Sequence, residues 1–174
     1  LLTTTWTPIG TITNPFKGHF DGGDHEIIDL QYSGNHDKPI GLFGCLNGAE
    51  IHNLTVIANI SHTKNYTGSI AGVAKNHSLI QNCYVSSSFD INSDLEIEDE
   101  ATGLICGYLE DSNIINCIDN DGVILNINNN RGIRQNVGGI CGKVGKVLED
   151  EKSTTEEIIN AKKSWKRANL FFPK

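Results

Sequence analysis

The sequence predicts an all-β fold, a parallel β-solenoid of about four coils, and three observations lead to this prediction. A short strand-like motif recurs four times along the chain. A glycine-rich motif accompanies the copies at a nearly fixed distance, whereas the segments between them vary in length. The chain has 18 glycines and few aromatic residues, which suits short strands joined by many turns. Such repeats bury their apolar faces by stacking, so we expect residues 1–148 to form one solenoid domain.

The strand-like motif is defined by three columns of aligned residues. Its four copies occupy residues 26–32, 50–56, 79–85 and 113–119. The first column consists of isoleucines, the second of Asp or Asn, and the third of Leu or Cys. The second column contains Asp29, Asn53, Asn82 and Asn116. Copies stacked in register would lie about 4.8 Å apart, so we expect these side chains to form a hydrogen-bonded ladder between neighbouring coils.

The glycine-rich motif occurs just before the second, third and fourth strand-like copies and once more after the last. Its copies occupy residues 40–44, 68–72, 103–107 and 138–142. We expect its glycines where the chain turns tightly or takes a positive φ. The segment Gly18-His-Phe-Asp21 reads as a degenerate earlier copy, with Phe20 in the place of Phe43. Long excursions are expected at 61–67, 86–101 and 119–136.

Several of these segments resemble one known family. Trp6-Thr-Pro-Ile-Gly10, Gly41-Leu-Phe-Gly44 and Ile51-His-Asn-Leu54 look like parts of the GLUG-motif repeat region of secreted or surface bacterial proteins. Such regions occur in adhesin-like proteins and in the non-catalytic part of immunoglobulin A1 protease-type peptidases. The resemblance covers about residues 6–145 and implies a β-helical module, usually right-handed and displayed on a surface. It implies no catalytic motif, and the chain departs from the family at the turn Asp21-Gly-Gly-Asp-His25 and in its cysteines.

Residues 149–174 differ in character from the repeats and are expected to form a helical cap and tail. Ser153-Thr-Thr-Glu156 fits a helix capping box. An apolar stripe with basic residues opposite follows over 158–168. A solenoid end exposes unpaired strand edges that must be covered, which favours a capping role over contact of a basic amphipathic helix with a membrane surface.

The charge of the chain limits its partners. The net charge is −7, with −10 over residues 1–142 and +3 over residues 143–174. An acidic body argues against nucleic acid, because phosphates require cations. The sequence contains no run of eighteen apolar residues, so no membrane span is expected.

The candidate binding residues are carboxylates in the excursions. Asp94 and Asp99 belong to an acidic stretch, and Asp119 and Asp121 resemble a fragment of a calcium loop that lacks the downstream Glu. A solvated loop and loose calcium binding are the two interpretations of these residues, and no other cofactor is expected. The ligand of such loops would be a glycan or a protein.

Cysteines and histidines give no catalytic or metal prediction. Cys83 and Cys117 share one column, and Cys106 and Cys141 share another. Small apolar filling of the interior is favoured over disulfides between coils, so all five thiols are expected to be reduced. None of the six histidines has a partner at metal-ligand spacing, and no nucleophile elbow is found.

The function predicted from these features is that of a non-catalytic module. We expect an adhesin-like binding or spacer segment of a larger secreted or cell-surface protein. The alternatives are a carbohydrate-active β-helix enzyme, such as a polysaccharide lyase or hydrolase, and an accessory domain of a secreted peptidase. The enzyme alternative requires acidic and basic residues together on one face, whereas body cations are sparse here.

Overall fold

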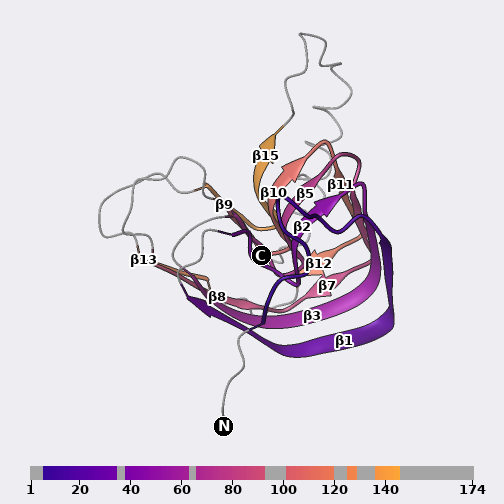
Figure 1. The fold of residues 1–174 in the computed structure, drawn as a ribbon. Coiled ribbons are helices and arrows are strands. Elements are labelled where there is room, and N and C mark those ends of the chain that lie inside the picture. The colour runs from indigo at the N-terminus through magenta and orange to yellow at the C-terminus, as the bar shows by residue number, and fades with distance from the viewer. Residues whose placement is uncertain are drawn as a thin grey trace, which may run out of the picture.

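The structure of the protein is a computed structural model that describes residues 6–34, 38–62, 66–92, 101–119, 125–128 and 136–145. These residues form fifteen β-strands and no helix (Figure 1). The all-β prediction is therefore confirmed for this part of the chain. The expected helical cap at 149–174 lies outside the described residues. None of the described segments is a helix with the length and hydropathy needed to cross a membrane.

The strands form three sheets in which every pair is parallel. The eight-stranded sheet contains β1 (His19–Gly34), β3 (Glu50–His62), β6 (Leu79–Gln81), β7 (Tyr84–Val85), β8 (Ser88–Asn92), β11 (Asn113–Ile115), β12 (Ile118–Asp119) and β13 (Leu125–Asn128). The four-stranded sheet contains β2 (Phe43–Asn47), β5 (Ala71–Lys75), β10 (Cys106–Glu110) and β15 (Cys141–Gly145). The three-stranded sheet contains β4 (Tyr66–Thr67), β9 (Ala101–Gly103) and β14 (Asn136–Gly138).

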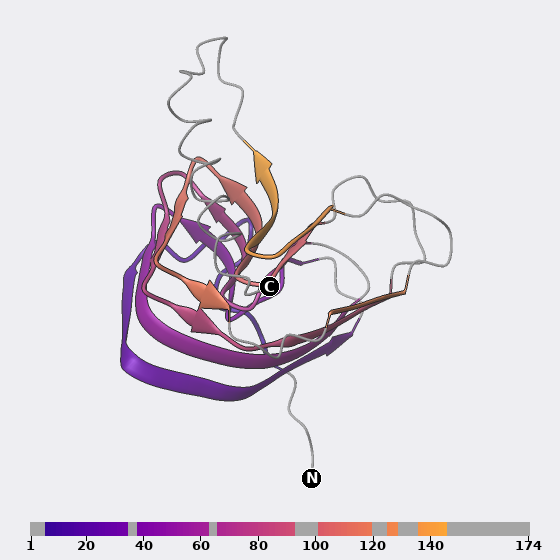
Figure 2. The same cartoon turned by 180° about the vertical axis from the view of Figure 1, so that it is seen from behind.

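The chain visits the three sheets in a fixed order. From β4 it passes through β5 in the four-stranded sheet and then β6, β7 and β8 in the eight-stranded sheet, before it returns to the three-stranded sheet at β9. The same order repeats from β9 to β14. Figures 1 and 2 show the successive passages lying on one another, from indigo β1 at one end to orange β15 at the other. This arrangement is compatible with a β-solenoid.

The predicted isoleucine column is present in the last three copies. Ile51 pairs with Ile80, and Ile80 pairs with Ile114, in adjacent parallel strands. Ile51 and Ile80 are fully buried, and Ile114 is 8% exposed. The strands β3, β6 and β11 thus direct these isoleucines inward and the residues on either side of them outward.

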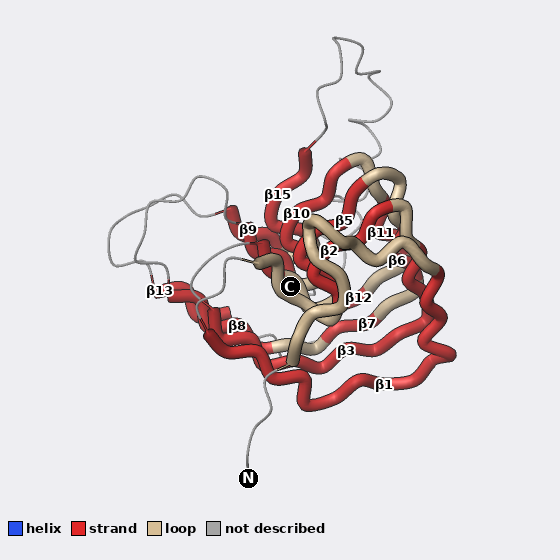
Figure 3. The backbone as a smooth tube through the Cα atoms, in the orientation of Figure 1, coloured by secondary structure: helices blue, strands red, loops and turns tan. Residues whose placement is uncertain are grey.

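The predicted alignment of the first copy of the motif is wrong. Ile27 does not lie opposite Ile51 but opposite Val56, and Phe20 takes the position opposite Ile51 instead of the place of Phe43. The physical reason is that Phe20 packs against the core opposite Ile51 and sets the register of β1. Two irregularities follow, between Asp21 and His25 and between Ile27 and Leu30. They insert extra residues into β1, so more residues of β1 than of β3 span the same length of the sheet. The tube in Figure 3 shows β1 running beside β3 along its length.

The recurring glycines serve close approach of the backbone. A Cβ atom on Gly72 would lie 2.6 Å from the backbone nitrogen of Ile40 and 2.6 Å from Pro39 Cβ. A Cβ atom on Gly44 would lie 2.5 Å from the carbonyl oxygen of Gly10. Neither glycine has a positive φ. Close approach of the segments at residues 8–10 and 39–40, and not the left-handed conformation, therefore requires glycine at these positions.

The core lies between the three sheets. Its largest fully buried side chains include Phe43, Ile70 and Ile105 from the four-stranded sheet and the turns that enter it, and Ile51 and Phe89 from the eight-stranded sheet. Because these side chains face inward, the outer face of the eight-stranded sheet is left to polar residues and a few isoleucines. That outer face carries the candidate functional site.

Candidate functional site

The site begins where β1 and β3 run side by side. Phe20 packs against the core and Ile51 is fully buried, so the residues flanking each of them point outward. His19 lies opposite Glu50, and Asp21 lies opposite His52. Four polar side chains, two imidazoles and two carboxylates, therefore gather on one small area of the outer face.

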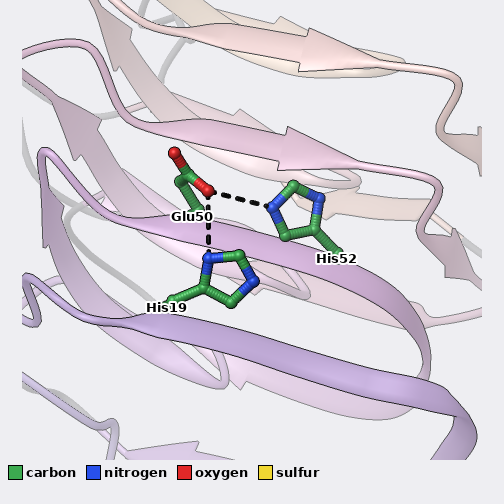
Figure 4. A group of neighbouring side chains, drawn as sticks. All are labelled: His19, Glu50 and His52. Atoms are coloured by element: carbon green, nitrogen blue, oxygen red, sulfur yellow. Dashed lines mark hydrogen bonds and ion pairs between the residues drawn. The ribbon is translucent and has the colours of Figure 1, made fainter.

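Three of these side chains converge. His19 Nδ1 lies 3.0 Å from Glu50 Oε2, and His52 Nε2 lies 3.4 Å from the same oxygen (Figure 4). The two imidazole rings are tilted by 31° with their centroids 4.8 Å apart. The possible ligand atoms of the three residues all lie within 4.8 Å of one another. We call this group the His-Glu-His cluster.

The cluster lies on the surface but is not uniformly exposed. The side chain of His19 is 60% exposed and that of Glu50 is 52% exposed, whereas His52 is only 16% exposed. His52 is thus held by its surroundings, while His19 retains freedom to rotate. Solvent reaches the cluster from the side opposite the strands.

Asp21 adds a second carboxylate beside the cluster. Its Oδ1 accepts hydrogen bonds from the backbone N–H of Gly23 at 2.9 Å and from Asn53 Nδ2 at 3.0 Å. The Gly23 bond, then the Asn53 bond and the nearby His52 and His19, lower the pKa of Asp21 below its usual value. Asp21 therefore stays ionised and contributes a negative charge next to the two imidazoles.

A row of amides continues from Asp21 along the outer face. Asn116 Nδ2 donates to Asn82 Oδ1 at 3.4 Å, and Asn82 Nδ2 donates to Asn53 Oδ1 at 3.3 Å. All three asparagines have φ of 51° or 52°, the left-handed region in which Asn is tolerated better than most residues. The column therefore combines a backbone requirement with side-chain hydrogen bonds.

Asp29 does not belong to this row, although the repeat pattern predicts that it does. Ile27 lies opposite Val56 and Leu30 lies opposite Ala58. Asp29 therefore lies beside the part of β3 that follows Val56, and not beside Asn53. Asp21 occupies the end of the row instead, through its bond with Asn53. Asp29 shares only the left-handed backbone, with φ of 57°.

The predicted loop carboxylates are not brought together by the described residues. Asp94, Asp99 and Asp121 lie outside the part of the chain that the structure describes. Asp119 ends β12, where its backbone pairs with Val85. A shared binding site or a calcium site formed by these four residues stays a prediction.

The sequence interpretation missed the His-Glu-His cluster, although two signals for it were present. Glu50 and His52 are two residues apart in a strand, so they must share a face. The place of His19 beside Glu50 follows only if Phe20 is aligned with Ile51. The alignment of Ile27 with Ile51 gave a different neighbour. Ligand spacing along the sequence is a poor guide when neighbouring strands supply the partners.

The cysteines belong to the interior and not to a site on the outer face. Cys45, Cys83 and Cys106 are buried, Cys117 and Cys141 are partly buried, and all five are free. Cys106 pairs in register with Cys141. The hydrogen bond with Cys141, and then burial, raise the pKa of the Cys106 thiol, whereas the same bond lowers the pKa of Cys141.

Comparison with known proteins adds no functional information. No protein-family model, no curated protein and no solved structure matches the chain. The function of the outer face must therefore be inferred from its own geometry, exposure and charge.

Proposed function

We propose that this chain is a non-catalytic binding module of a larger secreted or cell-surface protein. In this proposal the three parallel sheets belong to a right-handed β-solenoid whose end is covered by a helix at 149–174. The partner is a glycan or a protein on a neighbouring surface. The resemblance to GLUG-motif repeats supports the location and the modular character.

The proposal rests on one observation, the composition of the outer face of the eight-stranded sheet. Four large apolar side chains are exposed on the same sheet as the row of asparagines. Their exposed fractions are 59% for Ile28, 37% for Ile57, 41% for Ile115 and 60% for Ile118. Several large apolar side chains exposed on one sheet face favour an interaction site there. Amides beside them supply hydrogen bonds that orient a ligand.

The rigidity of this face suits binding. The strands beneath it are parallel, β6 and β7 pair with β3 in register, and buried side chains such as Ile80 and Val85 fix their inner faces. A ligand would therefore meet a preformed surface and would lose little affinity to ordering of the protein. The net charge of −7 favours neutral or cationic ligands over nucleic acid.

Binding is tested with the purified chain on a glycan array and against extracellular matrix proteins. The variants Ile28→Ser and Ile118→Ser change the outer face. Val144→Ser is the matched control, because Val144 is 57% exposed but belongs to β15 of the four-stranded sheet. The proposal expects ligand binding that both outer-face variants weaken and the control retains.

The enzyme alternative is tested beside it with a panel of polysaccharides in a depolymerisation assay. Turnover of any polymer by the purified chain would reject the non-catalytic proposal. Binding unchanged in both isoleucine variants but lost when residues 93–100 are replaced by a Gly-Ser linker of equal length would place the contact in the excursions and not on the outer face. Absence of any ligand would favour a spacer.

A further inference from the structure

We propose that His19, Glu50 and His52 form a binding site for one divalent transition-metal ion of the Zn²⁺ class. The site is independent of the proposed ligand binding by the isoleucines and asparagines. The inference rests on the convergence of two imidazole nitrogens, from two neighbouring strands, on one carboxylate oxygen.

The distances fit a metal site. Zinc binds histidine nitrogen and carboxylate oxygen at about 2.0–2.2 Å, so two ligand atoms of a tetrahedral ion lie roughly 3.3 Å apart. The separations from Glu50 Oε2 are 3.0 Å to His19 Nδ1 and 3.4 Å to His52 Nε2. The remaining separation, between the two nitrogens, is within 4.8 Å and shortens by a small rotation of the exposed His19.

The donor atoms select the class of metal. Two imidazoles and one carboxylate suit Zn²⁺, Ni²⁺ or Cu²⁺, whereas Ca²⁺ and Mg²⁺ take oxygen ligands. Three protein ligands of this kind leave a fourth position of a tetrahedral zinc ion for water. That position would face the solvent, because the strands occupy the opposite side of the cluster.

The fold holds the three ligands in place before an ion arrives. Glu50 and His52 flank the buried Ile51 on β3, and His19 precedes Phe20, which packs against the core. The backbone positions of all three ligands are thus fixed by packing beneath the sheet. This arrangement reduces the entropy that metal binding must offset.

Asp21 supports the site without serving as a ligand. Its Oδ1 already accepts two hydrogen bonds, from Gly23 and Asn53. Its carboxylate lies in the same area of the outer face, opposite His52. It therefore adds negative charge that attracts a cation and partly balances the charge of the bound ion.

A second histidine–carboxylate pair provides a matched control. His77 Nδ1 lies 3.4 Å from Asp111 Oδ2, a distance equal to one of those in the cluster, but only one histidine takes part. The side chain of His77 is 84% exposed. One imidazole and one carboxylate supply too few ligands to hold zinc firmly, so this pair should not contribute to binding.

The test is a titration of the chelator-treated full chain with ZnCl₂ by calorimetry, repeated with His19→Ala, Glu50→Gln, His52→Ala and His77→Ala. The parent should bind one equivalent of Zn²⁺. Loss of each cluster residue should weaken binding by about tenfold or more, because removal of a supporting residue alone has an effect of this order. His77→Ala should bind like the parent.

Two further measurements separate loss of the site from loss of the fold and from zinc binding by cysteine. Circular dichroism verifies that each variant is folded, and the conservative Glu50→Gln keeps the test valid should an alanine variant unfold. The absorption spectrum of the Co²⁺-loaded chain distinguishes nitrogen and oxygen ligands from thiolates, which give an intense charge-transfer band. The proposal is overturned by a parent that binds no stoichiometric Zn²⁺, by parent-like affinity in Glu50→Gln and His52→Ala, or by a thiolate band.

Discussion

Asn82 donates its side-chain amide to Asn53 across 3.3 Å, and the two residues share a left-handed backbone with φ of 52° and 51°. Asparagine therefore meets two requirements at each position. It tolerates the left-handed backbone, and its side chain forms a hydrogen bond with the neighbouring asparagine. Glycine satisfies the first requirement only, and alanine satisfies neither.

This relationship predicts an order of stabilities at position 82. Asn82→Ala should lower the free energy of unfolding by about 1–2 kcal/mol, the cost of a left-handed backbone for a residue with a Cβ atom. Asn82→Gly should cost less than Asn82→Ala, although it also loses both ladder bonds. Because the Asn82 side chain is exposed, no large penalty for buried unpaired groups is expected. Urea denaturation measures both variants, and equal losses would show that the side-chain bonds dominate.

The carboxylate of Asp21 predicts a dependence of stability on pH. Its pKa is lowered in the fold, first by the Gly23 N–H and then by Asn53, so the ionised form stabilises the folded state. This contribution is complete above the usual carboxyl pKa of 3.8 and disappears as the pH falls through the lowered value. Asp21→Asn should therefore melt below the parent at pH 7, and the difference should close as the pH falls from 3.8 through the lowered pKa of Asp21. A difference that does not change with pH would contradict this assignment.

The close approach at Gly72 predicts a strong effect of a single methyl group. Gly72→Ala should lower the free energy of unfolding by about 1–3 kcal/mol, because its Cβ atom would meet Ile40 and Pro39 at 2.6 Å. Gly139→Ala is the control, since a Cβ atom at Gly139 meets nothing within 4 Å and its φ is not positive. Chemical denaturation compares the two variants. Similar losses would mean that the backbone shifts to admit the methyl group.

The cysteines predict a simple thiol count. Denaturation without reductant should release five thiols, because all five cysteines are free. In the folded chain, Cys45 and Cys106 should resist alkylation, since both are fully buried. Burial raises the pKa of Cys45, and the bond with Cys141 together with burial raises that of Cys106, so little reactive thiolate is present. Mass spectrometry after timed alkylation reads each site. A count of one thiol would instead show two disulfides.

The later repeats were predictable from the sequence because their spacing is regular. Ile51, Ile80 and Ile114 lie in one column, and Asn53, Asn82 and Asn116 in another, as like residues stacked on like. The parallel pairing follows from this stacking. The strands that carry these copies pair with no irregularity at the isoleucines, so alignment by type and alignment in space agree.

The first repeat was not predictable in the same way. Phe20, and not Ile27, pairs with Ile51, and Gly23 and Asp24, with φ of 57° and 59°, form an irregularity between them that leaves Ile27 opposite Val56. An alignment by residue type alone does not reveal such an insertion. The same displacement concealed His19 beside Glu50, so the His-Glu-His cluster required the register of the two strands. The predicted carboxylates Asp94, Asp99 and Asp121 lie outside the described residues, and their role stays a prediction.

The two irregularities in β1 have a consequence for association between molecules. Within the described residues, β1 pairs only with β3 and forms an edge of the eight-stranded sheet. A long, straight edge strand is a template on which another chain can add its own strand. Here the bulges bend the edge, and the exposed Asp24, Glu26 and Asp29 place negative charge along it. The two irregularities and the exposed carboxylates of β1 thus protect the fold against edge-to-edge aggregation.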